Sequence, residues 1–387
     1  MKKIPLSRPW ITMGDILSVV KVLRTPYLSL GPKLREFEAL FCQYIGRRFA
    51  TAVSCGTAGL HLCIRAEKIG ENDEVITTPF SFIASANCIL FERGFPRFID
   101  IDEETQNISP EKIKEFIEEN CKWDGEILVN KKTGKRIRAM LIVHIFGLPC
   151  AMQEIMEIAR KYNLRIIEDA CEAIGATYKG QKVGTFGEAS VFAFYPNKQI
   201  TTGEGGIILT DDENLDKLFK SMRNQGRMGR GWLSHEILGY NYRISDINCA
   251  LGISQMKRIE KILKKRKRIA QYYNQILKDI DEVITPAEIE NVERSWFVYV
   301  IMLQKGLESK RDKLIELLGK EGIESKNYFP PIHLQPFYRK EFGFKEGDFP
   351  VTESVSKRTI ALPFYTNLKF KDVEYVCDRL KKCFKLL

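Results

Sequence analysis

The stretch "VFAFYPNKQITTGEGGIILT", residues 191–210, places one lysine between two strand-like runs. The apolar run Val191–Tyr195 predicts a buried strand, Pro196 interrupts it, and "IILT" from Ile207 predicts the next strand after the glycine-rich "TTGEGG". Lys198 therefore lies in a turn. A lysine in such a turn can lose part of its hydration and its proton, as an amine must before it forms a Schiff base with an aldehyde. With 60 Lys and Arg in the chain, position alone favours an ordinary solvated lysine, so the surrounding residues must decide.

The composition is that of a globular protein. With 387 residues, 44% hydrophobic and 28% charged, the chain is long enough for one large domain and a smaller one. No apolar run approaches the ~20 residues of a membrane span, and the N-terminal "MKKIPLSRPW" has no apolar segment behind its lysines. We therefore expect a cytoplasmic protein without a membrane partner. The ten cysteines form no C-x-x-C pair, so we expect reduced core residues and neither a metal site nor a disulfide framework.

The net charge of +10 admits two explanations, nucleic-acid binding or attraction of a small anionic substrate. The densest basic run is "KRIEKILKKRKR", Lys257–Arg268. The apolar residues Ile259, Ile262 and, just after the run, Ile269 recur at helical spacing, which predicts an amphipathic helix. The basic residues would then form its polar face. A regulatory nucleic-acid-binding protein is therefore the least favoured alternative, and we expect no nucleic-acid partner.

Strands and helices alternate through the N-terminal two thirds of the chain. This order predicts a mainly parallel sheet with right-handed crossovers, flanked by helices. Near residue 256 the composition changes to long basic helices with fewer glycines. We expect a large α/β domain at residues 1–255 and a smaller α+β domain at residues 256–387. The polar segment Cys121–Arg138 predicts a surface hairpin or insertion, and its sequence indicates no function.

Polar and aromatic side chains follow several predicted strands. Ligands gather at the carboxyl ends of parallel strands, where Asp169, His144 and Lys198 all fall. The strand running into Ser54–Thr57 leads to a helix whose N-terminus offers N–H groups and a positive dipole end to a phosphate. Phe82 stands at the entrance of another helix, where an aromatic ring can stack on a flat cofactor.

This combination fits pyridoxal phosphate (PLP), although each feature alone is more often structural. A PLP site needs an amine for the Schiff base, a carboxylate at the pyridinium nitrogen, N–H groups for the phosphate and a flat stacking surface. The carboxylate matters because a protonated ring nitrogen makes the ring an electron sink for the carbanion at the substrate carbon. PLP is therefore the predicted cofactor.

Ten motifs occur in order along the chain: "GPKLREFE", "SCGTAGLHL", "ITTPFSFIASAN", "PRFIDID", "IVHIFG", "IIEDACEAIGA", "FYPNKQITTGEGG", "GYNYRISDINCALG", "PIHLQPFY" and "LPFY". With them the chain resembles, over essentially its whole length, the nucleotide-sugar aminotransferases of the DegT/DnrJ/StrS family, PLP enzymes of fold type I. The resemblance implies that fold, with a large α/β domain and a small C-terminal domain. It also implies the cofactor contacts: Lys198 as the Schiff-base lysine, Asp169 as the pyridine-nitrogen partner, Phe82 as the stacking ring, and Gly56 and Thr57 at the phosphate, joined by Asn241 from the other subunit of a homodimer.

Two positions depart from the family pattern. Glu172 stands where the family often has Gln or His, and we expect it to change hydrogen bonding near the cofactor ring. Ala193 stands where a serine often touches the phosphate, so that contact is expected to be missing or supplied elsewhere. Family members that act as sugar dehydratases carry histidine in place of the lysine, and Lys198 argues against that branch.

The resemblance implies two half-reactions. Glutamate gives its amino group to PLP and leaves as 2-oxoglutarate, and the pyridoxamine form then aminates a nucleotide-diphosphate keto-sugar, a dianion that the net positive charge favours. The carbon expected to receive the amino group is C4 of a 4-keto-6-deoxy sugar, and C3 is the second choice. A related PLP enzyme that acts on a keto-sugar without transferring nitrogen is the alternative. Lys198 would shuttle the proton, and Arg243, His333 and Tyr365 are candidates for substrate contacts.

The glycines after Lys198 are expected to hold the backbone close behind the lysine. Bulk at Gly203, Gly205 or Gly206 should then misplace the amine and lower activity without unfolding the protein.

Overall fold

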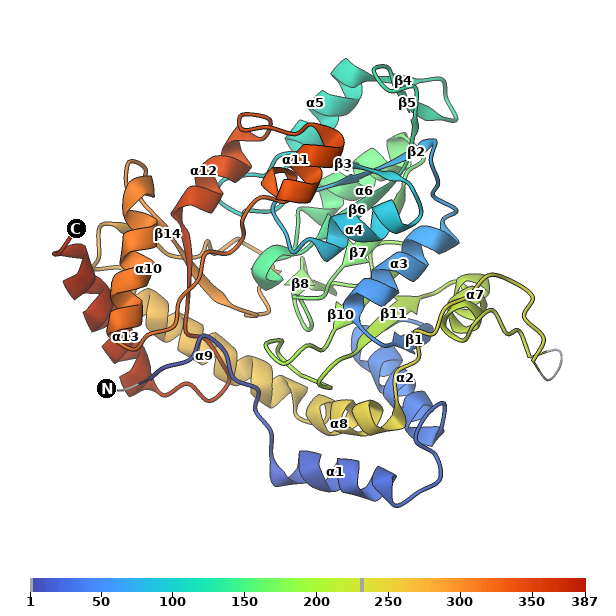
Figure 1. Ribbon diagram of the computed structural model, residues 1–387, viewed down its shortest axis with the longest axis horizontal. Helices are drawn as coiled ribbons and strands as arrows, with labels where there is room; N and C mark the ends of the chain where they lie inside the picture. Colours follow the sequence, from blue (N-terminus) through green and yellow to red (C-terminus); the bar gives the residue numbers. More distant parts are fainter. Residues whose placement is uncertain (1–2, 230–232) are drawn as a thin grey trace.

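The computed structural model describes residues 3–229 and 233–387, and its largest element is a nine-stranded sheet (Figure 1). Seven strands follow the order β1-β11-β10-β7-β6-β2-β3, and β5 pairs with both β4 and β6. The strands are β1 (Phe49–Val53), β2 (Asp73–Thr77), β3 (Phe95–Phe98), β4 (Cys121–Trp123), β5 (Leu128–Asn130), β6 (Arg136–Val143), β7 (Arg165–Asp169), β10 (Ala189–Ala193) and β11 (Gly206–Thr210).

The sheet is mainly parallel, as the alternation of strands and helices predicts. Strands β3, β2, β6, β7 and β10 run parallel to one another, whereas β11 is antiparallel to both β10 and β1. The reversal follows from the short connection between β10 and β11, because antiparallel neighbours can be joined without a crossover helix. Val191 pairs with Asp169 on one side and with Ile208 on the other. The connection that carries Lys198 therefore begins beside the carboxyl end of β7.

Helices pack against this sheet. Helix α2 begins at Pro32 and packs on β1, while α3 packs on β10 and β11. Aliphatic and aromatic side chains form two buried clusters between these layers. The helices of this part are α1 (Met13–Leu23), α2 (Pro32–Ile45), α3 (Gly56–Ala66), α4 (Ala84–Phe91), α5 (Pro110–Asn120), α6 (Met152–Lys161), α7 (Glu213–Arg223) and α8 (Asp246–Met256), with the 3-10 turn η1 (Ile145–Gly147) after β6.

A second, three-stranded sheet lies at the end of the molecule where both termini are found (Figure 1). Ile4 forms a parallel bridge to Ile323 and is buried in the same core, so the N-terminal segment packs with the C-terminal part. A third, small sheet has the order β13-β8-β9. The remaining elements are β8 (Thr177–Tyr178), β9 (Gln181–Lys182), α9 (Ile259–Leu277), β12 (Val283–Ile284), β13 (Val292–Glu293), β14 (Tyr299–Leu303), η2 (Glu308–Lys310), α10 (Arg311–Lys320), η3 (Ile332–Leu334), α11 (Pro336–Phe342), α12 (Pro350–Arg358), β15 (Thr359–Leu362) and α13 (Phe370–Phe384).

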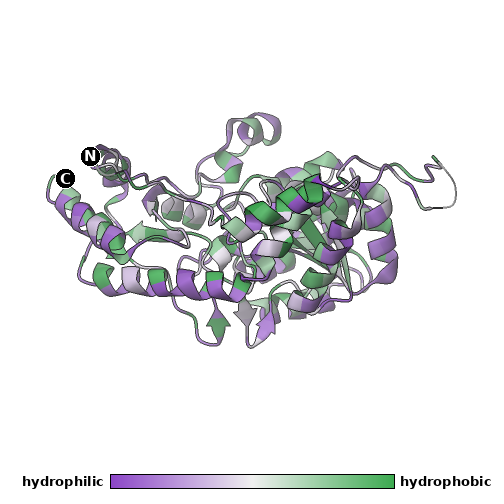
Figure 2. Ribbon diagram, turned by 90° about the horizontal axis from the view of Figure 1, so that it is seen from below, coloured by the Kyte–Doolittle hydropathy of each residue, from purple (hydrophilic) through white to green (hydrophobic). Residues whose placement is uncertain are grey.

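Helix α9 spans the two large cores. Its first turns bury Ile259 and Ile262 against the large sheet, and its later turns bury Ile269 and Tyr273 in the C-terminal core. The amphipathic helix predicted from the basic run is confirmed, and Figure 2 shows the helices carrying both polar and apolar segments. The proposed division at residues 255 and 256 remains a prediction.

The helical stretch that leads into the basic run is divided into two helices. Helix α8 ends at Met256 and α9 begins at Ile259, because Arg258 leaves the helical conformation with φ at −120°. The Arg258 guanidinium binds Asp15 of α1 at 2.6 Å and lies over the Trp10 ring at 4.7 Å. These contacts with the N-terminal segment accompany the break.

The segment Cys121–Arg138 forms a surface feature of the predicted kind. Strands β4 and β5 make an antiparallel hairpin, and the following turn leads into β6. Its Asn130 and Thr133 side chains donate to the buried Glu74 carboxylate at 2.9 and 2.8 Å, which ties the hairpin to β2.

All ten cysteines are free thiols, as predicted. Within residues 3–229 and 233–387, no helix has the length and apolar character needed to cross a membrane.

Candidate active site

Lys198 lies in a turn that backbone hydrogen bonds close on both sides. Its own N–H donates to the Tyr195 carbonyl at 2.9 Å, and the Phe194 N–H donates to the Gly205 carbonyl at 2.9 Å. The Nζ atom is 3.4 Å from Glu172 Oε1 and 4.0 Å from the centre of the Phe297 ring. Only 14% of the side chain is exposed. The amine is therefore held between a carboxylate and an aromatic ring, unlike an ordinary solvated lysine.

Asp169 ends β7 and is buried. Its Oδ2 accepts a hydrogen bond from the Ser85 hydroxyl at 2.7 Å, and its Oδ1 accepts one from the Cys171 N–H at 3.1 Å. The two donors fix the orientation of the carboxylate.

Glu172 follows Asp169 by three residues and faces Lys198. Its Oε2 accepts from the Phe146 N–H at 2.8 Å, while its Oε1 faces the Lys198 amine. Burial raises the pKa of Glu172, and the Lys198 ammonium offsets only part of that rise. Glu172 and Lys198 thus form a buried ion pair, and the expected effect on hydrogen bonding near the cofactor ring remains a prediction.

The turn between β1 and α3 presents a helix N-terminus to the same region. The strand ends at Val53, earlier than expected, and α3 already begins at Gly56. A Cβ on Gly56 would lie 2.7 Å from the Ala193 Cβ and 3.0 Å from the Cys171 Sγ, so only glycine fits beside these residues. The first N–H groups of a helix lack partners in the helix, so those of Gly56 and Thr57 are available to an anion.

The sequence profile of the DegT/DnrJ/EryC1/StrS aminotransferase family matches residues 11–381. The chain belongs to this family. An uncharacterized protein of Methanocaldococcus jannaschii, MJ1066, is 41% identical over 98% of this chain and 97% of its own. The GDP-perosamine synthase of Caulobacter vibrioides is 34% identical over 98% of both chains. The PLP form of a putative sugar aminotransferase of Streptococcus pneumoniae, Spr1654, superposes with a TM-score of 0.91 at 26% identity and covers 100% of both chains.

As a member of the DegT/DnrJ/EryC1/StrS family, the chain is a PLP-dependent sugar aminotransferase with the corresponding α/β fold. The residues present fit PLP. A partly buried amine, an oriented carboxylate and an open helix N-terminus follow strands β10, β7 and β1, and the cradle at Gly56 has no room for a side chain.

Ala193, where the DegT family often has serine, lies beside this helix N-terminus. Its Cβ faces Gly56, so the side chain at this position points toward the expected phosphate site but carries no donor. The loss of one phosphate contact at Ala193 remains a prediction.

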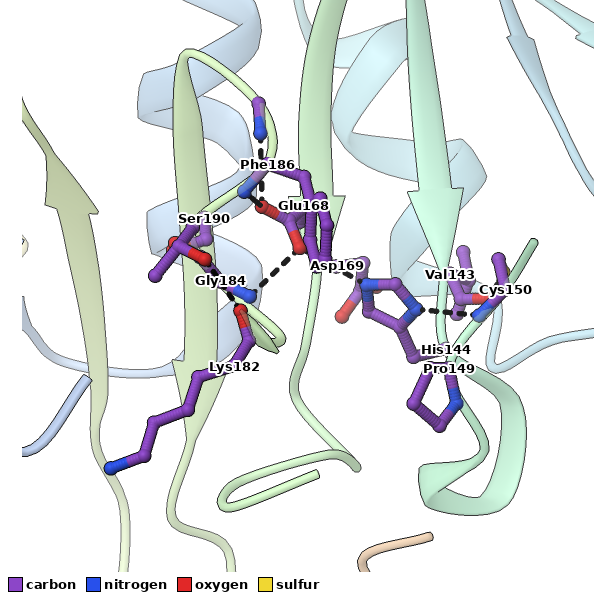
Figure 3. A network of polar contacts seen from close by, with 12 residues as sticks. Val143, His144, Pro149, Cys150, Glu168, Asp169, Lys182, Gly184, Phe186 and Ser190 are labelled. Carbon is purple, nitrogen blue, oxygen red and sulfur yellow. Dashed lines mark hydrogen bonds and ion pairs between the residues drawn. The ribbon is translucent and has the colours of Figure 1, made fainter. Parts of the chain in front are cut away.

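His144 and Glu168 form a buried network behind the site (Figure 3). His144 Nδ1 accepts from the Cys150 N–H at 3.1 Å, which leaves Nε2 to donate to Glu168 Oε2 at 3.3 Å. Glu168 also accepts from the N–H groups of Gly184, Phe186 and Gly187 at 2.7 to 3.0 Å. Burial by itself raises the pKa of Glu168, but hydrogen bonds from His144 and from this loop lower it overall. The network anchors the loop between β9 and β10.

The other predicted contacts lie in different environments. Phe82 is 61% exposed and Asn241 is exposed, and the roles expected for both remain predictions. Arg243 donates to Asn224 Oδ1 at 3.1 Å. His333 is fully buried and pairs with Glu353 at 3.1 Å, so the structure does not present it to a substrate. Tyr365 is half-buried against the C-terminal core, and its role remains a prediction.

Three residues near the lysine and the aspartate were not found by sequence reasoning. Ser85 stands one helical turn after Phe82, and that spacing is a signal that could have identified it. Phe297 lies under Lys198, and Gln199 Nε2 donates to the Ser295 hydroxyl at 2.8 Å. No local pattern points to Phe297, because it comes from the C-terminal part of the chain.

Proposed function

We propose that this family member transfers the amino group of glutamate to the keto carbon of a nucleotide-diphosphate sugar. The first choice of position is C4 of a 4-keto-6-deoxy sugar. The observation that carries the proposal is the placement of the Lys198 amine, 3.4 Å from Glu172, at the strand edge where Asp169 is oriented by two donors. Support for a nucleotide sugar comes from the relative named a GDP-perosamine synthase. The net charge of +10 is consistent with an anionic substrate.

PLP, when bound, supplies an aldehyde that carries the amino group and a ring that accepts the electron pair left at the substrate carbon. Lys198 would hold the aldehyde and then move a proton at the substrate carbon. Asp169 would hold the charge at the ring nitrogen, Phe82 would stack on the ring, and the N–H groups of Gly56 and Thr57 would bind the phosphate.

Glu172 would set the charge state around Lys198. A carboxylate beside the amine attracts the ammonium form, and a neutral carboxyl group does not. Glu172, the expected departure from the family pattern, is therefore the residue that contacts the amine proposed to transfer the proton.

The proposal is tested with purified protein reconstituted with PLP. We expect an absorption band of lysine-bound PLP in the wild type and its loss in Lys198→Ala. With glutamate and a panel of keto-sugar nucleotides, 2-oxoglutarate should form in step with the amino sugar. A wild type without the band, or a Lys198→Ala protein that keeps it, would contradict the proposal.

The same assay separates the alternatives. Conversion of a keto-sugar without 2-oxoglutarate indicates the related enzyme that does not transfer nitrogen. The position of nitrogen in the product, read by NMR, separates C4 from C3 amination.

A further inference from the structure

A buried serine holds the carboxylate proposed for the ring nitrogen. The Ser85 hydroxyl donates to Asp169 Oδ2 at 2.7 Å, and Ser85 is 1% exposed, so bulk water does not compete for this contact. The Cys171 N–H occupies one site on Oδ1 at 3.1 Å. Each carboxylate oxygen can accept two hydrogen bonds, so Asp169 keeps capacity for a further donor such as a protonated ring nitrogen.

A second hydroxyl extends this contact. Ser81 Oγ lies 3.1 Å from Ser85 Oγ and is also buried. A hydroxyl has one proton, and the 2.7 Å contact to the carboxylate is shorter than the 3.3 Å contact from Ser85 Oγ to the Phe82 carbonyl. The Ser85 proton therefore points to Asp169, and Ser81 donates to Ser85. Such chains of hydroxyls strengthen the terminal bond to the anion.

Ser85 also belongs to the turn that carries Phe82. Its backbone N–H donates to the Phe82 carbonyl at 3.3 Å at the entrance of α4. One turn of backbone thus presents the exposed Phe82 ring and the buried donor to Asp169.

We propose that Ser85 is a positioning residue for the cofactor ring. Its hydroxyl fixes Asp169 at the ring nitrogen, and its backbone keeps that carboxylate in register with the Phe82 ring. The proposal rests on the roles given above to Asp169 and Phe82, and it adds a residue that reaches the cofactor only through Asp169.

The experiment compares two cofactors on the apoprotein, PLP and a pyridoxal phosphate analogue with carbon in place of the ring nitrogen. In Ser85→Ala we expect roughly tenfold weaker binding of PLP, because one hydrogen bond to a charged group is lost. Binding of the analogue should stay unchanged, since it has no ring nitrogen for Asp169 to meet. Ser85→Thr keeps a hydroxyl and should restore PLP binding.

Ser221→Ala is the matched control, because it removes a buried hydroxyl in α7 that has no hydrogen-bond partner among the described residues. Thermal unfolding of each apoprotein checks that the fold is kept. Equal weakening of PLP and of the analogue in Ser85→Ala would overturn the proposal, since that result indicates general disruption of the pocket. Behaviour identical to Ser221→Ala would overturn it as well.

These outcomes are separate from failure of the proposed function, which would appear as a wild type that forms no lysine-bound PLP. If Ser85→Thr does not fold, the proposal is still tested by comparing how Ser85→Ala and Ser221→Ala bind the two cofactors.

Discussion

At the scale of single residues, Lys198 is paired with the buried carboxyl group of Glu172. The two groups lie 3.4 Å apart, and the side chains are 14% and 9% exposed. A pair of this kind responds to pH through the carboxyl group, because burial raises the pKa of Glu172 above its usual value of 4.5. As the pH falls through the raised value, Glu172 becomes neutral and the ion pair is lost.

We therefore predict an acid limb in the pH dependence of kcat that lies above pH 4.5 and disappears in Glu172→Gln. The glutamine keeps an acceptor for the Phe146 N–H, but it cannot form the ion pair. At neutral pH the kcat of Glu172→Gln should be roughly tenfold below that of the wild type, as expected when a charge-assisted contact of ~1.5 kcal/mol is removed. Steady-state kinetics from acid to neutral pH measure both effects. An unchanged acid limb in Glu172→Gln would assign it to another group.

At the scale of elements, the glycines after Lys198 differ in what surrounds them. A Cβ on Gly206 would lie 2.6 Å from the backbone carbonyl of Cys55, which caps α3. A Cβ on Gly203 would meet Asn248 Nδ2 at 3.8 Å, an ordinary contact, but the φ of +83° is a conformation that other residues rarely adopt. Gly206 thus lets β11 approach the start of α3, whereas Gly203 only allows the turn.

The two glycines should respond differently to substitution, which revises the sequence-based expectation at Gly206. Gly206→Ala must separate β11 from α3 and should lower the free energy of unfolding by about 3 kcal/mol together with PLP binding. Gly203→Ala adds backbone strain and should cost about 1 kcal/mol while PLP binding is largely kept. Chemical denaturation and PLP titration of the two variants measure the contrast. Equal losses of stability and of PLP binding in the two variants would show that the close approach of Gly206 to Cys55 contributes to neither.

The loop between β9 and β10 depends on one buried carboxylate. Glu168 accepts from three backbone N–H groups and from His144, so Glu168→Gln should lower the free energy of unfolding by about 3 kcal/mol at neutral pH. The pKa of Glu168 is lowered in the folded protein, so its stabilisation is present above pH 4.5 and is lost as the pH falls through the folded value.

The difference between wild type and Glu168→Gln in urea denaturation should therefore shrink on acidification. Glu115→Gln, at an exposed position on α5, is the control and should have little effect at any pH. A constant difference across the acid range would show that the charge of Glu168 is not the stabilising feature.

At the scale of the whole molecule, the role proposed for Asn241 involves a second copy of the chain. Asn241 is exposed, and its segment is tied to its own subunit by an antiparallel bridge to Asn224 and by the Tyr242 carbonyl, which accepts from the Ser54 N–H at 2.8 Å. The segment is thus rigid on one side and open on the other. This arrangement supports the proposal that Asn241 reaches the phosphate site of the other subunit.

Mixed dimers test this sharing of the active site. Lys198→Ala and Asn241→Ala should each be weak or inactive alone at limiting PLP. After unfolding and refolding together, a mixed dimer has one site with both original residues, so activity should exceed that of either variant. Refolding each variant alone is the control. No gain on mixing, with mixed dimers confirmed by differently tagged chains, would place Asn241 outside the partner's site.

The sequence alone determined the alternation of strands and helices, the mainly parallel sheet, the turn of Lys198 and the membership of the family. These features rest on local patterns, because periodicity, strand breaks and ordered motifs are properties of neighbouring residues. Local patterns also set the amphipathic helix in the basic run, although they did not reveal the break at Arg258, which accompanies a contact with Asp15 far away in the chain.

Only the tertiary structure decided which groups surround the lysine and the aspartate. Ser85 and Asp169 are 84 residues apart, and Phe297 comes to Lys198 from the C-terminal part of the chain. His333, a candidate for the substrate, is enclosed by packing that its own motif does not show. The physical reason is the same in each case. Burial and hydrogen-bond partners depend on which distant segments the packed core brings together, and a local pattern contains no information about them.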